Sequence, residues 1–138
     1  MLNRKSRIFI AGHKGMVGSA IKRKLLEKGY GNLITIERKK LDLINQDQTY
    51  KFLKKYKPNF VILAAAKVGG IAANAKFKEK FLFENLQIQN NIIHGSYLAG
   101  VKNLFSLGSS CIYPKFCKQP MKEKYLLSGP LEESNDAY

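Results

Sequence analysis

Short apolar runs alternate with longer amphipathic segments along the chain, and this alternation restricts the possible fold more than any other feature. The apolar runs, typical of β-strands, cover residues 7–12, 32–37, 59–66 and 102–108, with the third expected to be fully buried. Helical spacing of apolar residues predicts helices over 17–28, 46–56 and 78–99, with a glycine- and alanine-rich loop at 67–75. Strands that are apolar without interruption fit a parallel sheet covered on both faces. The sequence therefore predicts a doubly wound α/β fold, in which ligands bind beyond the carboxyl ends of the strands.

The composition is that of a single globular domain. The chain has 138 residues, of which 45% are apolar. No apolar run reaches the roughly eighteen residues that span a bilayer, and the first residues lead straight into a strand pattern without a cleavage site, so we expect a cytoplasmic protein with no membrane partner. Cys111 and Cys117, six positions apart, fit a reducing compartment, and without a Cys or His cluster at ligand spacing no structural metal is expected.

The net charge of +14 does not by itself indicate a nucleic-acid partner. Most of the charge is lysine spread at spacings that suit solvated helix faces, whereas nucleic-acid readers gather arginine and stacking aromatics in one patch. We therefore expect no nucleic-acid binding. The positive field would still attract an anionic small molecule such as a nucleotide.

Glycines 12, 15 and 18 lie between the first strand and the first helix. A strand that runs through glycines into a helix lets a pyrophosphate approach the unpaired N–H groups of the helix N-terminus. The spacing is G-x-x-G-x-x-G and departs from the G-x-G-x-x-G pattern, so a tight turn without a ligand is the alternative. The strand and helix on either side favour a nucleotide.

The end of the second strand carries both an acid and a base, Glu37 and Arg38. An acid at this place commonly binds a ribose 2′-hydroxyl, and an arginine commonly accepts a 2′-phosphate. Lys14 in the glycine turn adds a second cation that could reach the same phosphate. The sequence therefore favours NADP over NAD, although Glu37 would repel a 2′-phosphate if it pointed inward.

The end of the fourth strand carries a serine pair, Ser109 and Ser110, and Tyr138 follows 29 residues after Ser109. With the three glycines, these residues resemble the extended short-chain dehydrogenase/reductase family. Longer words make the resemblance more specific: "GHKGMVGSAI", "AAAKVGGIAAN", "NNIIH", "GSSCIYPK" and "KQPM". They resemble, within that family, the NADPH-dependent bifunctional enzymes that epimerise GDP-4-keto-6-deoxy-D-mannose at C3 and C5 and reduce it at C4 to GDP-L-fucose. The resemblance covers residues 8–138.

The resemblance implies a role for three residues near the substrate. Ser109 would hydrogen-bond the substrate carbonyl oxygen, Tyr138 would be the proton donor of the family's Y-x-x-x-K motif, and Cys111 would move a proton at a carbon beside the ketone during epimerisation. Hydroxyl donors at one oxyanion would serve both reactions. The implied cofactor-binding residues are Gly12, His13, Lys14, Gly15, Met16, Val17, Gly18, Arg38, Leu41, Asp42, Leu43, Ala64, Ala65, Ala66, Leu107, Gly108, Ser109 and Ser110.

The resemblance also implies that these residues are the N-terminal part of an NADP-binding Rossmann domain. The family's lysine would fall at position 142, and its epimerisation histidine, last strands and substrate domain would lie further on. We expect the 138-residue chain alone to be inactive, with its sheet incomplete at the C-terminal side. Relatives dimerise through the long helix at 78–99 and the helix that would begin at Tyr138, which implies a homodimer for the full-length enzyme.

Two other functions remain open: another nucleotide-sugar enzyme of the family, a 4-epimerase or 4,6-dehydratase, or a catalytically dead nucleotide-binding module. The first is disfavoured because those enzymes lack a cysteine at the position of Cys111. Cys117 is interpreted as incidental, and His94 as a surface or interface residue. Lys67 follows the third strand, where a solvated role and a substrate contact both remain open.

Overall fold

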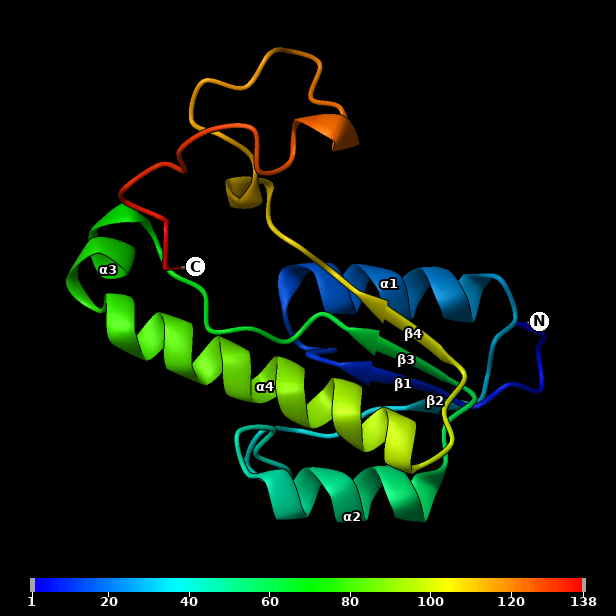
Figure 1. Ribbon diagram of the computed structural model, residues 1–138. Helices are drawn as coiled ribbons and strands as arrows, with labels where there is room; N and C mark the ends of the chain where they lie inside the picture. Colours follow the sequence, from blue (N-terminus) through cyan, green and yellow to red (C-terminus); the bar gives the residue numbers. More distant parts are fainter. Residues whose placement is uncertain (1, 138) are drawn as a thin grey trace. The chain divides into compact units, whose positions relative to one another are not determined.

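The computed structural model describes residues 2–137 (Figure 1). Its elements are β1 (Ile8–Ala11), α1 (Met16–Glu27), β2 (Leu33–Ile34), α2 (Gln46–Tyr56), β3 (Phe60–Leu63), α3 (Ile71–Lys76), α4 (Lys78–Leu98), β4 (Asn103–Ser106) and the 3-10 turns η1 (Ser110–Ile112) and η2 (Glu123–Tyr125). The chain divides into two compact units. The first comprises the residues up to 66 together with 86–107, and the second comprises 67–85 together with the residues from 108 onward.

The first unit is built on a four-stranded parallel sheet with the strand order β2-β1-β3-β4. Phe9 of β1 pairs with Ile34 of β2 on one side and with Val61 of β3 on the other, and Leu63 of β3 pairs with Ser106 of β4. The chain moves outward from β1 to β2 and then crosses to β3, so the direction of winding changes between β1 and β3. This arrangement confirms the predicted doubly wound class.

One face of the sheet forms the hydrophobic core of the first unit. Figure 1 shows α2 and the C-terminal half of α4 on this side of the sheet and α1 on the other. Side chains that alternate along β1 and β3 point to the same face, and here they meet the apolar stripes of α2 and α4. The buried cluster comprises Phe9, Ala11, Leu41, Phe52, Leu53, Val61, Leu63, Ile88 and Ile92.

The α1 face is covered less completely, which corrects the prediction that both faces are buried. Ile8 and Ile10 are fully buried. Phe60 and Ile62 are only half-buried, so β3 is not the fully buried strand predicted. In β4, Phe105 is 57% exposed. Among the described helices, only α1 lies on this side of the sheet, and it packs against β1, leaving the β3–β4 half open (Figure 1).

Two elements differ from their predicted extent. The second strand is only two residues long instead of spanning 32–37, since Leu33 and Ile34 are the residues that pair with β1. The chain then turns after Glu37, where the Lys40 amide donates to the Glu37 carbonyl at 2.9 Å. The predicted loop at 67–75 contains α3, a run rich in alanine, the best helix former, that begins after Gly70. The predicted helix at 46–56 is confirmed to the residue, because Asn45 caps its first turn by accepting from the Gln48 amide at 3.0 Å.

Polar side chains tie the second unit together around the junction of α3 and α4. Lys78 Nζ donates to the Glu133 carbonyl at 2.7 Å and pairs with Asp136 at 2.8 Å. Asn74, which is buried, donates through Nδ2 to Asn135 Oδ1 at 2.7 Å. The segment 133–136 is therefore held to the start of α4 and to α3.

None of the helices among residues 2–137 is long and apolar enough to cross a membrane.

Candidate functional site

The glycine turn after β1 requires glycine at two of its three positions. Gly12 has φ of +85°, and a Cβ there would lie 2.6 Å from the carbonyl oxygen of Ala64. A Cβ on Gly18, the buried position of α1, would overlap the carbonyl oxygen of Gly12. The turn thus presses against the end of β3, and α1 starts directly on the turn. No side chain at either position stands between the backbone and a ligand.

The N-terminus of α1 has no internal anion. Its N-cap residue is Gly15, which offers no side-chain oxygen, and there is no acid in the first turn. Met16 and Val17, the first helical residues, are exposed. The first N–H groups of a helix lack intrahelical acceptors, so this end of α1 can receive the oxygens of a phosphate.

His13 adds little charge to the turn. Partial burial, followed by the nearby charges of Lys22 and Lys14, lowers the pKa of His13 below its usual value. The imidazole is therefore neutral at pH 7, and Lys14 supplies the positive charge of the turn.

Lys14 and Glu37 form an ion pair across the carboxyl ends of β1 and β2. Lys14 Nζ lies 2.6 Å from Glu37 Oε1, with both side chains largely in solvent. The hydrogen bond from Lys14 is the main reason that the pKa of Glu37 is lowered. Glu37 is therefore paired with Lys14, one of the two cations predicted to hold the 2′-phosphate.

The segment after β2 that was predicted to border the adenine is fixed by a residue the sequence analysis did not single out. Asn91 of α4 is fully buried, and its Nδ2 donates to the carbonyls of Leu43 and Ile44 at 2.9 Å each. Leu41 is buried in the core, and Asp42 Oδ1 accepts from the Ile44 amide at 3.2 Å. The available signal was an asparagine within the otherwise apolar core face of a predicted helix.

The ends of β1, β3 and β4 meet at the same edge as the glycine turn. The Ala64 amide donates to the Ala11 carbonyl at 3.0 Å, and the Leu107 amide donates to the Leu63 carbonyl at 3.2 Å. The sheet pairing thus continues past the strands into the predicted groove residues. The predicted cofactor-binding residues of the first unit that line this edge are Gly12, Ala64, Ala65, Ala66 and Leu107.

The predicted substrate residues belong to the second unit or lie outside the described structure. Ser109 Oγ accepts a hydrogen bond from the Cys111 amide at 3.1 Å and caps η1. This bond uses the hydroxyl as an acceptor and leaves its proton for another partner. Both Ser109 and Cys111 are half-buried. Gly108 and Ser110 flank Ser109 in the same unit, and Tyr138 lies outside the described residues.

Asn85 fixes the loop after β3. Its Oδ1 accepts from the Lys67 amide at 2.6 Å, and its Nδ2 donates to the Lys67 carbonyl at 3.1 Å. The Lys67 side chain lies 3.8 Å from Glu84 Oε2. Lys67 is therefore engaged with an acid and is not simply a solvated lysine, and its backbone position depends on Asn85.

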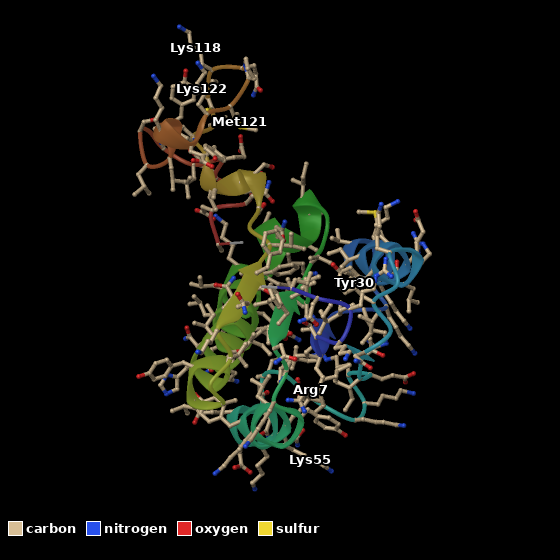
Figure 2. The ribbon with its side chains drawn as sticks, turned by 90° about the vertical axis from the view of Figure 1, so that its right-hand side faces the viewer. Arg7, Tyr30, Lys55, Lys118, Met121 and Lys122 are labelled. Carbon is tan, nitrogen blue, oxygen red and sulfur yellow. The ribbon has the colours of Figure 1, made fainter. Side chains whose placement is uncertain are left out.

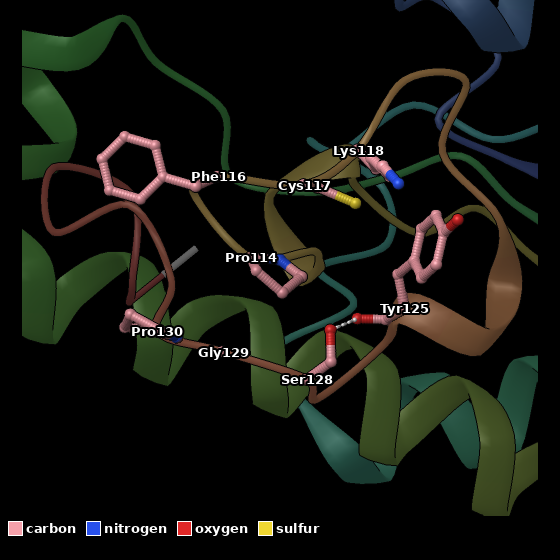
Figure 3. Close-up of a pocket in the computed structure, with 8 residues that line it drawn as sticks. All are labelled: Pro114, Phe116, Cys117, Lys118, Tyr125, Ser128, Gly129 and Pro130. Carbon is pink, nitrogen blue, oxygen red and sulfur yellow. Dashed lines mark hydrogen bonds between the residues drawn. The ribbon is translucent and has the colours of Figure 1, made fainter.

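The second unit contains a pocket of about 260 Å³, drawn in Figure 3. The Ser128 hydroxyl donates to the Tyr125 carbonyl at 2.7 Å along one wall. Cys117, interpreted from the sequence as incidental, is half-buried and borders this pocket, whereas Ser109 and Cys111 do not. The lining residues are Pro114, Phe116, Cys117, Lys118, Tyr125, Ser128, Gly129 and Pro130.

The loop beside this pocket is basic at its tip. Lys118, Met121 and Lys122 lie on the outermost part of the second unit's loop in Figure 2. Within residues 2–137, no three His, Cys, Asp or Glu side chains are grouped so as to hold a metal ion.

Comparison with known proteins gives a consistent family. The model of the NAD dependent epimerase/dehydratase family matches residues 8–138. A putative GDP-L-fucose synthase 2 from Arabidopsis thaliana is 54% identical over 138 residues, and a GDP-L-fucose synthase from Sinorhizobium fredii is 53% identical over 132 residues. These alignments cover 100% and 96% of this chain. The chain spans 42% of the length of each of these relatives.

Solved structures agree with this result. A GDP-L-fucose synthetase from Naegleria fowleri bound to NADP superposes with a TM-score of 0.86 at 32% identity, covering 100% of this chain and 41% of that chain. MlghC, a GDP-mannoheptose C4 reductase from Campylobacter jejuni with NADP bound, has a TM-score of 0.92 at 45% identity, covering 97% of this chain and 42% of that chain.

Proposed function

The chain belongs to the NAD dependent epimerase/dehydratase family, and from that premise we propose that the protein containing it converts GDP-4-keto-6-deoxy-D-mannose to GDP-L-fucose with NADPH. The observation that carries this proposal is the identity of 53% over 132 residues to the GDP-L-fucose synthase from Sinorhizobium fredii. The Ser109–Cys111 turn supports it, because one short turn carries both a hydroxyl and a thiol.

The residues at the carboxyl edge of the sheet fit NADP. Gly12 and Gly18 leave the backbone of the turn open, and the uncapped N-terminus of α1 suits the pyrophosphate. Lys14 and Arg38 would hold the 2′-phosphate, and Asp42 and Leu43 would border the adenine. When bound, NADPH supplies the hydride for reduction at C4.

The side chains of the second unit would transfer protons to and from the sugar. A ketone acidifies its neighbouring C–H bonds, so Cys111 would exchange a proton at a carbon beside C4 while the electron pair is held on the carbonyl oxygen as an enolate. Ser109 would donate its proton as a hydrogen bond to that oxygen. In the reduction, Tyr138 would transfer its hydroxyl proton to the same oxygen as the C4–H bond forms.

The protein is further proposed to act as a homodimer through α4. Leu82, Leu86 and Ile93 are each about half exposed and follow one another at helical spacing along one side of the helix. Burying this stripe against a second copy would remove apolar surface from water. Light scattering on the protein should give twice the monomer mass, and the double substitution Leu86→Glu with Ile93→Glu should halve it.

A direct assay tests the proposed function. The protein that contains residues 1–138 is incubated with GDP-4-keto-6-deoxy-D-mannose and NADPH, and both the loss of NADPH absorbance and the product stereochemistry by NMR are followed. We expect stoichiometric oxidation of NADPH and formation of GDP-L-fucose. Cofactor binding without turnover of the keto sugar would contradict the proposal and indicate a nucleotide-binding module.

A second candidate is C4 reduction of a GDP-linked keto sugar without epimerisation. It is favoured by the 45% identity to the GDP-mannoheptose C4 reductase. The same assay separates the two functions, because the second predicts NADPH oxidation with retained configuration at C3 and C5. Running the reaction in D₂O adds a second readout, since epimerisation through an enolate exchanges the protons on those carbons for deuterium and simple reduction does not.

A further inference from the structure

We propose that Glu37 determines cofactor specificity as an internal competitor: it pairs with Lys14, must be displaced from it by a 2′-phosphate, and accepts a hydrogen bond from a 2′-hydroxyl. This inference rests on the proposed dinucleotide site at the glycine turn. It predicts that the protein binds NADPH less tightly than Lys14 and Arg38 alone would allow, and that it also binds NADH.

The position of the pair follows from the sheet. Strands β1 and β2 are parallel neighbours, with Ile8 opposite Leu33. Lys14 follows β1 and Glu37 follows β2, so both reach the same carboxyl edge although they are 23 residues apart. The Nζ–Oε1 distance of 2.6 Å is a direct charge-assisted hydrogen bond.

The exposure of the pair makes it exchangeable. The side chains of Lys14 and Glu37 are 67% and 49% exposed, so a ligand can reach both. Exposed ion pairs are weak because water and salt screen them. A phosphate carrying between one and two negative charges is a stronger partner for the ammonium group than one carboxylate, so NADPH can bind, but only after Glu37 is separated from Lys14.

The charges around Glu37 show why this residue affects the relative affinity for NADPH and NADH. Lys14, Lys40 and His13 all act on Glu37, and the first two are cations that stabilise its ionised form. Glu37 is therefore charged at neutral pH and lowers the positive potential of this corner of the site. When NADH binds, the Glu37 carboxylate can remain paired with Lys14 and also accept a hydrogen bond from the ribose 2′-hydroxyl. Glu37 thus opposes the binding of NADPH and supports the binding of NADH.

The test compares binding of matched ligands to the protein that contains residues 1–138. Adenosine 2′,5′-bisphosphate and adenosine 5′-monophosphate are measured by calorimetry, and NADPH and NADH by fluorescence. Glu37→Gln should tighten the 2′-phosphorylated ligands by about two- to fivefold and weaken NADH by a similar factor. Glu27→Gln is the matched control, since it removes the same charge and breaks another exposed pair, Lys24–Glu27 at 2.7 Å, at the other end of α1.

A double-mutant comparison adds a readout that a merely structural role would not change. In the Glu37→Gln background, Lys14→Gln should weaken adenosine 2′,5′-bisphosphate more than it does with Glu37 present, because the lysine is no longer shared. An unchanged NADPH to NADH ratio in Glu37→Gln would overturn this inference while leaving the proposed function intact. Failure of every dinucleotide to bind would overturn both.

Discussion

Asn85 holds the backbone of Lys67 at both its polar groups, accepting from the amide at 2.6 Å and donating to the carbonyl at 3.1 Å. A primary amide can accept from a peptide N–H through its oxygen while it donates to a C=O through its nitrogen. Asn85 is 5% exposed, so both bonds are partly shielded from water. The loop between β3 and α3 therefore has a defined conformation that depends on one side chain.

Replacing Asn85 with alanine should destabilise this loop. The substitution leaves the part-buried amide and carbonyl of Lys67 without their partner, which costs about 1–3 kcal/mol. Urea unfolding should show the loss in stability, and hydrogen exchange at the Lys67 amide should become faster. Asn90→Ala, on an exposed position of the same helix, is the matched control and should leave both measurements unchanged. Equal effects of the two variants would contradict the role of Asn85.

The glycine turn gives a second prediction, with the control supplied by the chain itself. Gly18→Ala would place a methyl group inside the van der Waals radius of the Gly12 carbonyl, so α1 would have to move off the turn. The expected loss is about 1–3 kcal/mol with weaker nucleotide binding. Gly31→Ala has no atom within 4 Å of its new Cβ and should change stability by less than about 0.5 kcal/mol. Thermal unfolding and nucleotide titration of both variants test the difference.

The proposed division of chemical roles gives a third prediction. Cys111→Ala removes the thiol but keeps the backbone amide that donates to Ser109, so η1 should be retained. The variant should lose solvent deuterium exchange into the sugar by roughly 10²–10⁴-fold. Tyr138→Phe should instead remove NADPH oxidation while exchange continues. Cys117→Ala should affect neither reaction, and equal loss of both activities in Cys111→Ala and Tyr138→Phe would show that the roles are not divided.

The sequence predicted the parts of the fold that depend on local pattern. The helix at 46–56 was predicted to the residue because its cap, its amphipathic face and its end are all encoded within a few positions. Strand exposure was not, since the half-burial of Phe60 and Ile62 depends on which helices cover the α1 face. Residues such as Asn85, which act through side-chain hydrogen bonds to a distant part of the chain, carry no periodic signal.

The candidate site, too, was predicted only where it depends on local pattern. The glycine turn was predicted because Gly12 and Gly18 are required by backbone conformation and close packing, which leave a pattern in the sequence. The contact between Lys14 and Glu37 was not predicted, because residue types alone do not reveal whether an acid faces the ligand or a neighbouring cation.

The contacts of Lys78 with Glu133 and Asp136 in the segment 133–136 lead to a last prediction. Hydrogen bonding from Lys78 lowers the pKa of Asp136 below its usual value, so the carboxylate form is favoured in the folded protein. A lowered pKa contributes stability that is present above the unfolded value near 3.8 and is lost as pH falls through the folded value. Protection of the Asn135 amide, which donates to the Glu132 carbonyl at 2.9 Å, should therefore decrease below about pH 4.

Lys78→Met removes the charge and the hydrogen bond while keeping an unbranched side chain, so it should release the segment at neutral pH as acid does in the parent protein. Because Tyr138 follows this segment directly, the proposed reductase should lose kcat with little change in the KM for NADPH, as expected for a positioning residue. Lys80→Met, two residues further along the same helix, is the control and should keep the parent's pH profile of Asn135 exchange. A parent-like exchange profile in Lys78→Met would show that Lys78 does not hold the segment 133–136 in place.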